Sequence, residues 1–145
     1  MIPRLTARPL VPGTASGIVL RSHVPLSLWG GVDPSDGTII DRRHDRCGEA
    51  IAGRVLVLPA EKGSSTASAV LVELVRVGCG PAAIVASTLS PILALGAIVA
   101  ELMYGVTVPV LRVSEEEVAA LEDGLRASVE ADGTIRLASP DRSSR

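Results

Sequence analysis

The stretch LPAEKGSSTASAVLVEL, residues 58–74, places a Lys-Gly-Ser-Ser-Thr turn between two apolar segments. A flexible linker would also be rich in Gly, Ser and Thr, so the flanking residues must distinguish the two cases. Before the turn, the short β-branched run GRVLVL (residues 53–58) is typical of a buried strand. After the turn, apolar side chains recur at helical spacing up to Gly78; they are Ala67, Val70, Leu71, Leu74 and Val75. We therefore expect a strand, a tight turn and a helix.

The same alternation continues on both sides of this unit. Short runs bounded by Gly and Pro predict further strands at residues 16–21, 81–87 and 106–113, and a short one at 38–41. A C-terminal hairpin is expected from residues 127–131 and 134–138, with Asp132-Gly133 at its turn. Strands that alternate with helices in this way predict an α/β fold with right-handed crossovers.

Two more helices are predicted from their end signals. Ser90 is the expected N-cap of the first, Pro91 follows at its first position, and Gly105 lies just past its end. Its body is apolar nearly all round, so we expect burial on both sides or against a partner. Ser114 and Glu117 have the spacing of a capping box for the other helix, which is expected to end at Gly124.

Length and composition limit the classes of function. A chain of 145 residues with 47% hydrophobic content can bury one compact core, and we expect a single domain over residues 1–145 with its core at 13–138 and a frayed tail at 139–145. A net charge of −2 provides no basic stripe for nucleic acid. Residues 90–104 are too short and too charged for a membrane span, and the early prolines argue against a signal peptide. We expect a cytoplasmic protein.

The potential metal ligands match no known motif. Cys47 and Cys79 lack a CxxC companion, so we expect two buried free thiols and no zinc or iron-sulfur site in this chain. Between residues 33 and 47 lies a group of potential ligands, namely Asp33, Asp36, Asp41, His44 and Cys47. Its spacing fits neither a calcium loop nor a zinc motif, so we interpret it as turn chemistry and solvated surface, with a substrate-facing loop as the alternative.

The Ser-rich turn has the chemistry of an anion site. A helix start carries unpaired backbone N–H groups and partial positive charge, which favour a carboxylate or phosphate. Lys62 adds a full charge, Gly63 allows close backbone approach, and Ser64 and Ser65 present hydroxyl groups. The spacing is equally consistent with Ser64 or Ser65 acting only as an N-cap. A hydrolase is disfavoured, because the only histidines, His23 and His44, stand in no G-x-S-x-G context.

Three stretches together carry a family resemblance. They are SLWGGVDPSDGTIIDRRHDRCGEAIAGRVLVLP, KGSSTASAVLVELVRVGCGPAAIV and ILALGAIVAELMYGVTVPVL. Over residues 13–112 the chain resembles the small subunit of aconitase X, with WGGVDP and GSST as the specific motifs. The resemblance implies a single swivelling β/β/α domain of the aconitase type.

The resemblance also implies an enzyme, a hydro-lyase subunit that is active only with a large subunit. In that superfamily the large subunit carries an iron or iron-sulfur centre, and the swivelling domain supplies a serine base. Carried over, the base is Ser64, with Lys62, Gly63, Ser65 and Thr66 around an anionic substrate. No cofactor or metal is expected in this chain.

Two departures from the family pattern concern the cation of the site. Aconitases proper have arginine after the serine pair, whereas this chain has Thr66, so the charge would come from Lys62, Arg54 or the partner. Lys62 itself stands where aconitase X more usually has arginine, which loses bidentate geometry but keeps charge.

The resemblance suggests further site residues and two substrates. Trp29, Gly30 and Gly31 would form a loop near the site, with Asp33 and His44 as additional candidates, although a packing role for Trp29 fits equally well. The substrates associated with the family are cis-3-hydroxy-L-proline and mevalonate 5-phosphate, and the Lys-poor composition favours the first. The alternative is a non-catalytic anion-binding or regulatory module of the same fold.

Overall fold

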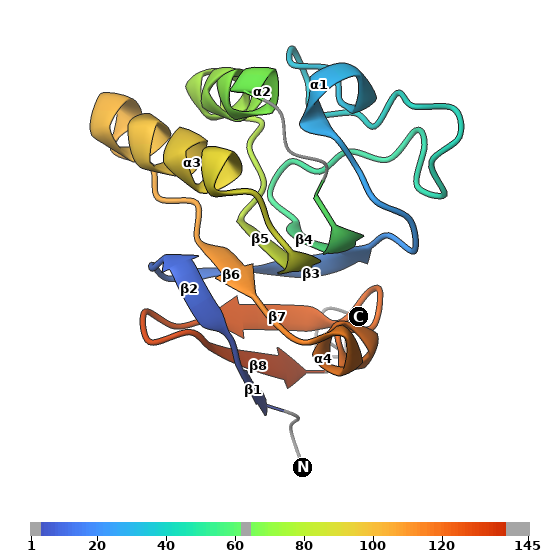
Figure 1. Ribbon diagram of the computed structural model, residues 1–145, viewed down its shortest axis with the longest axis vertical. Coiled ribbons are helices and arrows are strands. Elements are labelled where there is room, and N and C mark those ends of the chain that lie inside the picture. Colours follow the sequence, from blue (N-terminus) through green and yellow to red (C-terminus); the bar gives the residue numbers. More distant parts are fainter. Residues whose placement is uncertain (1–3, 62–64, 139–145) are drawn as a thin grey trace, which may run out of the picture.

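The computed structural model describes residues 4–61 and 65–138, and its eight strands form one mixed sheet in the order β1-β8-β7-β3-β4-β5-β6-β2 (Figure 1). The strands are β1 (Arg4–Thr6), β2 (Arg8–Val11), β3 (Ala15–Arg21), β4 (Val55–Ala60), β5 (Ala83–Thr88), β6 (Val110–Arg112), β7 (Arg126–Val129) and β8 (Thr134–Ala138). The helices are α1 (Leu28–Gly31), α2 (Ser65–Arg76), α3 (Pro91–Tyr104) and α4 (Glu115–Ala120). The predicted α/β class is confirmed.

The centre of the sheet is parallel. β3, β4, β5 and β6 pair in that order with parallel register, and α2 and α3 lie in the connections between them. The predicted end signals are confirmed: the Ser90 hydroxyl accepts from the backbone N–H of Ile92, and Gly105 ends α3 with a φ of 69°. Ser114 and Glu117 form the predicted capping box of α4.

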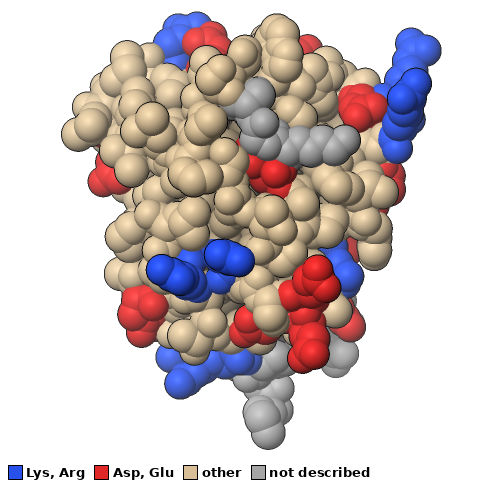
Figure 2. Space-filling model, in the orientation of Figure 1, with Lys and Arg blue, Asp and Glu red and all other residues tan. Residues whose placement is uncertain are grey.

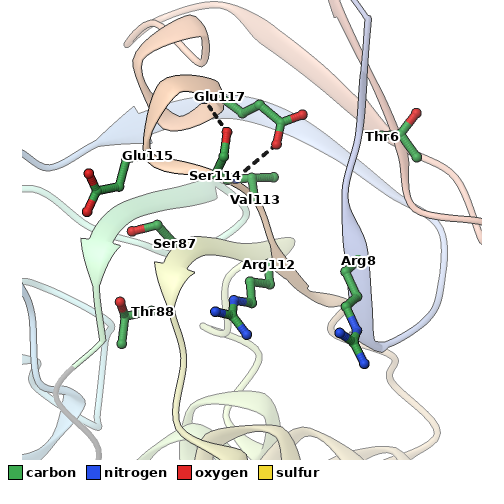
Figure 3. A pocket seen from close by; sticks show the side chains of 9 residues that line it. All are labelled: Thr6, Arg8, Ser87, Thr88, Arg112, Val113, Ser114, Glu115 and Glu117. Carbon is green, nitrogen blue, oxygen red and sulfur yellow. Dashed lines mark hydrogen bonds between the residues drawn. The ribbon is translucent and has the colours of Figure 1, made fainter.

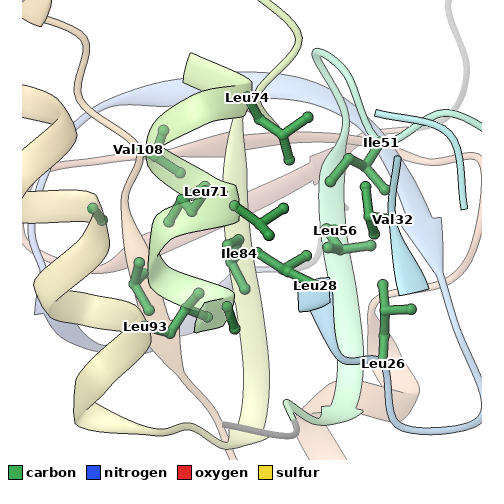
Figure 4. Packing of buried hydrophobic residues seen from close by; sticks show 14 of the residues in the cluster. Leu26, Leu28, Val32, Ile51, Leu56, Leu71, Leu74, Ile84, Leu93 and Val108 are labelled. Atoms are coloured by element: carbon green, nitrogen blue, oxygen red, sulfur yellow. The ribbon is translucent and has the colours of Figure 1, made fainter. Parts of the chain in front are cut away.

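Each parallel strand faces two separate cores. In β4, Leu56 and Leu58 contribute to the cluster beneath α2 and α3, whereas Val55 and Val57 contribute to the cluster on the other face. This alternation follows from the period of two along a strand. Figure 4 shows the first cluster, in which the leucines of α2 pack against the strands and α1. The second cluster lies between the parallel strands and β7, β8 and α4 (Figure 1).

The N-terminal strands close the sheet, and no sequence pattern predicted them. β1 pairs with β8 and β2 pairs with β6, so the two ends of the strand order belong to one segment interrupted only by Ala7. The backbone N–H of Ala7 donates to the carbonyl of Gly133 at 2.8 Å, and a Cβ on Gly133 would come within 2.3 Å of the Ala7 carbonyl oxygen. Ala7 and Val11 of this segment are buried.

Other boundaries differ from the prediction as well. The expected strand at residues 38–41 is wrong, because Thr38 and Ile39 make only single bridges to Ala50 and Val32. The strand expected over 106–113 is shorter in the structure, where it is β6. The last of the three predicted helices is α4, which ends at Ala120, before the expected Gly124.

The two thiols are free, as predicted, but the prediction that both are buried is wrong. Cys47 is exposed and Cys79 is half-buried. Cys79 packs at the edge of the core beneath α2 and α3.

One face of α3 remains exposed. Its inner side packs on α2 and the sheet, so the prediction of burial on both sides holds for one side only within this chain. The outer side presents large apolar residues, among them Leu102 at 82% exposure and Leu95 at 57%. Figure 2 shows few charged side chains over α2 and α3. No helix in the described ranges has the length and apolar character needed to cross a membrane.

Candidate functional site

The Ser-rich turn connects two elements that meet at one edge of the sheet. β4 ends at Ala60 and α2 begins at Ser65, and the neighbouring parallel strands β5 and β6 end at the same edge. In open α/β sheets, ligands bind beyond the carboxyl ends of parallel strands. Ser65 and Thr66 are exposed in the first turn of α2, which contains no acidic residue. Lys62, Gly63 and Ser64 lie outside the described residues.

A buried carboxyl group, Glu61, directly precedes the turn, and sequence reasoning missed it. Its residue is 5% exposed, its backbone N–H donates to the carbonyl of Thr88 at 3.0 Å, and its Oε2 accepts from the N–H of Ser90 at 3.3 Å. Oε1 is buried and has no hydrogen-bond partner among the described residues. Burial raises the pKa of Glu61, and the Ser90 hydrogen bond lowers it less. The signal in the sequence was a carboxylate between an apolar strand and the turn.

The raised pKa of Glu61 predicts a pH-dependent stability difference. Because the folded-state pKa lies above the unfolded value, the unfolded chain releases this proton first as pH rises from about 4.3. The stability contribution of Glu61 then falls with increasing pH until the folded-state pKa is passed. We expect the unfolding free energy of wild type minus that of Glu61→Gln to decrease over this range in urea titrations. A difference that rises with pH would contradict the assignment.

The buried Ser22 and His44 and the exposed Asp45 form a polar network that superficially resembles a catalytic triad. The Ser22 hydroxyl lies 2.7 Å from His44 Nε2 and 3.1 Å from Asp45 Oδ1. However, His44 Nδ1 accepts from the backbone N–H of Arg46 at 3.0 Å, so in the neutral ring Nε2 carries the proton and donates to Ser22. A nitrogen that donates cannot take the serine proton, so the arrangement is structural and is not a hydrolase site.

Replacing Ser22 by alanine is therefore expected to change stability. The buried Nε2–H of His44 would lose its acceptor, which costs about 1–3 kcal/mol. Urea unfolding of Ser22→Ala measures the loss, with Ser16→Ala as a matched control at an exposed position of β3. Equal stability of Ser22→Ala and wild type would show that the network does not stabilise the loop that carries His44 and Asp45.

The WGG motif borders an open cavity of about 500 Å³. Trp29 is 60% exposed, so a packing role for its ring within this chain is not supported. Gly30, with a φ of 78°, and Gly31 complete the short turn of α1, and the imidazole of His44 lies at the back of the cavity with no solvent exposure. The structure thus brings together four of the additional candidate residues in one cavity.

The other two additional candidates lie elsewhere. Asp33 makes an Asx turn in which the hydroxyl and the N–H of Ser35 donate to its carboxylate, and these bonds lower the pKa of Asp33. Arg54 precedes β4 and donates to the carbonyls of Ile18 and Val19 at 3.1 and 3.3 Å. Because β4 spans about 17 Å, Arg54 stands at the opposite end of the strand from the turn and cannot replace the missing arginine.

A polar pocket of about 630 Å³ lies at the carboxyl edge of β5 and β6 (Figure 3). Its lining residues are Thr6, Arg8, Ser87, Thr88, Arg112, Val113, Ser114, Glu115 and Glu117. A smaller hollow beside it shares Ser87, Thr88 and Glu115 and extends to Ala60, the last residue of β4. The two hollows form a continuous strip that reaches the residue before Glu61.

Within residues 4–61 and 65–138, no group of three or more His, Cys, Asp and Glu side chains could hold a metal ion. The Asp33 to Cys47 group therefore does not assemble into a ligand set.

Comparisons with known proteins agree on one family. A sequence model described as the aconitase X swivel domain matches residues 4–137. The chain is 42% identical over 126 residues to the phosphomevalonate dehydratase small subunit of Methanothermobacter thermautotrophicus, and covers 92% of it with 86% of its own length. It is 46% identical over 118 residues to the cis-3-hydroxy-L-proline dehydratase of Pseudomonas aeruginosa, using 80% of this chain but spanning only 20% of that protein.

The fold gives the same result. The crystal structure of Thermococcus kodakaraensis aconitase X in its holo-form matches with a TM-score of 0.84 at 36% identity, over 94% of this chain and 99% of that one. The resemblance seen in the sequence is therefore confirmed. With a family match over almost the whole described chain and a shared fold, this chain belongs to the aconitase X swivel domain family.

Proposed function

We propose that this chain is the small subunit of an aconitase X type dehydratase, in which Ser64 removes a proton from an anionic β-hydroxy substrate. The observation that carries the proposal is the position of the turn, between the carboxyl end of β4 and the first turn of α2. The relatives named as dehydratase small subunits support the reaction class.

The role of each residue follows from the charge that develops. Ser64, as its alkoxide, takes a proton from the carbon next to the substrate carboxylate, and the electrons of the C–H bond form a C=C bond as hydroxide leaves. The N-terminus of α2 and Lys62 stabilise the alkoxide electrostatically. The exposed hydroxyls of Ser65 and Thr66 donate to the substrate anion. We assign the departure of the hydroxyl group to the large subunit, because the described residues here hold no metal ligand set.

Two compounds are candidate substrates, mevalonate 5-phosphate and cis-3-hydroxy-L-proline. The relative named for phosphomevalonate is 42% identical to this chain, and the relative named for cis-3-hydroxy-L-proline is 46% identical to it. These similar values do not favour one substrate over the other. Anaerobic co-expression of this chain with a large subunit, followed by assays of both compounds, tests the proposal. Dehydration of either one supports it. A stable complex that dehydrates neither, or no complex at all, would favour the non-catalytic binding module.

We further propose that the large subunit covers the exposed face of α3. Ile92, Leu95, Ile98 and Leu102 follow helical spacing on this face, with exposures from 40% to 82%. Leu95 also lines a hollow of about 330 Å³ between α2 and α3, together with Val72 and Val99. Such a contiguous apolar surface is typical of an interaction site.

Leu102→Asp is expected to weaken binding of the large subunit about tenfold or more, because a charge would be buried in the interface. Titration calorimetry with the purified large subunit measures the effect. Ala120→Asp, an exposed position on α4 at the other face of the sheet, is the matched control. Wild-type affinity of Leu102→Asp would place the interface elsewhere.

A further inference from the structure

Two arginines lie opposite each other at the edge of the polar pocket. Arg8 on β2 and Arg112 on β6 are direct partners in the antiparallel register, so their side chains leave the sheet on the same face. Both are exposed and both line the pocket, and Figure 3 shows their guanidinium groups on the same side of it.

The described residues give no structural reason for this pairing. Like charges directly opposite each other on adjacent strands destabilise a sheet. Neither guanidinium forms an ion pair or hydrogen bond with another residue of the described ranges. The other arginines that have partners among the described residues bond to carboxylates or carbonyls, as Arg46 does to Asp123 at 2.9 Å. An anion between Arg8 and Arg112 would remove the repulsion.

The acidic residues of the pocket do not supply that anion. Glu117 Oε1 accepts from the N–H of Ser114 at 2.9 Å in the capping box of α4. Glu115 lies on the side of the pocket away from the two arginines in Figure 3. The hydroxyl of Thr88 faces the pocket and forms no hydrogen bond within the described residues, so it is free to donate to a ligand.

We propose that Arg8 and Arg112 form a binding site for a phosphate monoester group, and that this group belongs to the substrate of the dehydratase. Two guanidinium forks match the charge and the several oxygens of a phosphate dianion. A zwitterionic amino acid offers a single carboxylate, which the α2 end of the site would already bind. The assignment to the substrate rests on the proposed function, whereas the phosphate site itself does not.

The polar pocket extends to the strand ends that lead into the turn. The carbonyl of Thr88, a pocket residue, accepts from the backbone N–H of Glu61, the last described residue before the turn. In mevalonate 5-phosphate the phosphate stands at the opposite end of the molecule from the carbon that loses the proton. The pocket therefore holds one end of the substrate and the turn acts on the other.

The phosphate site is tested on the full chain without a partner. Inorganic phosphate is titrated at constant ionic strength, and backbone amide shifts are followed by NMR. We expect saturable shifts at Arg8, Ser87, Thr88 and Arg112, and affinity lowered about tenfold or more in Arg8→Gln and Arg112→Gln. Arg126→Gln removes the same charge at an exposed position of β7 outside the pocket and should bind as wild type does. Absence of saturable binding, or an equal loss in all three variants, would overturn the site.

The link to the substrate is tested in the complex with the large subunit. Arg112→Gln should raise KM for mevalonate 5-phosphate about tenfold or more, while kcat changes little, and Arg126→Gln should change neither. Phosphate binding with an unchanged KM, or dehydration of cis-3-hydroxy-L-proline alone, would overturn the substrate assignment. If the complex dehydrates neither compound, the proposed function fails, and the titration still decides whether the phosphate site exists.

Discussion

Replacing Ser64 by alanine is expected to lower kcat for dehydration by about 10²–10⁴-fold in the assembled enzyme, because the base that takes the carbon-bound proton is removed. KM should change little, since Lys62, Ser65 and the α2 N-terminus still bind the anion. The measurement is steady-state kinetics of the anaerobic complex on whichever substrate wild type dehydrates. Binding of the variant to the large subunit should equal that of wild type.

The matched control is Ser128→Ala, which removes the same hydroxyl from β7, away from the carboxyl edge of the parallel strands. It should retain wild-type kcat and KM. If Ser64→Ala keeps full kcat and only stability falls, Ser64 is an N-cap and the base belongs to another residue.

A large loss of stability is expected for Gly96→Val, where α3 crosses α2. A Cβ at Gly96 would lie 2.8 Å from the Cβ of Ser68 and 2.9 Å from its Cα and carbonyl oxygen. Backbone cannot move aside as a flexible side chain can, so the helices must separate. We expect about 2–3 kcal/mol of destabilisation and a decrease in Tm of roughly 5–10 °C, measured by thermal and urea unfolding.

Ala69→Val adds similar volume at an exposed position of α2 and should lower Tm much less. A Gly96→Val protein as stable as the control would mean that α2 and α3 can separate at little cost. In that case the packing of α3 would not hold the first turn of α2 firmly. The proposed role of Ser65 and Thr66 requires a firmly held turn.

The central strands and helices could be predicted from the sequence because their formation depends on interactions within each segment. GRVLVL alternates between two cores, and the Ser90, Gly105 and Ser114 signals satisfy helix ends within their own segments. The prediction of a strand at 38–41 was wrong because turns at Asp36-Gly37 and after Asp41 bound this segment. Its residues therefore form only isolated bridges.

The N-terminal strands could not be predicted in this way. β1 has three residues, β2 contains Pro9, and each pairs with a segment near the far end of the chain. Their strand conformation depends on those tertiary partners, which local propensity does not include.

The same division holds for the candidate site. The Lys-Gly-Ser-Ser turn could be found because a strand, a glycine and a helix start follow one another in sequence. Burial of Glu61 depends on α3 and the loop at Leu26, and the Arg8 and Arg112 pair depends on a strand register. Arg54 was a candidate cation in the sequence, and only the length of β4 shows that it stands at the wrong end.

The most direct test is an add-back titration, in which a large subunit purified alone and anaerobically is supplied with increasing amounts of this chain. Dehydration of mevalonate 5-phosphate and of cis-3-hydroxy-L-proline is measured at each step. If this chain supplies the base, the large subunit alone should show almost no turnover of either, and turnover of one should rise with the added chain and saturate. Turnover by the large subunit alone that the added chain leaves unchanged would contradict the account.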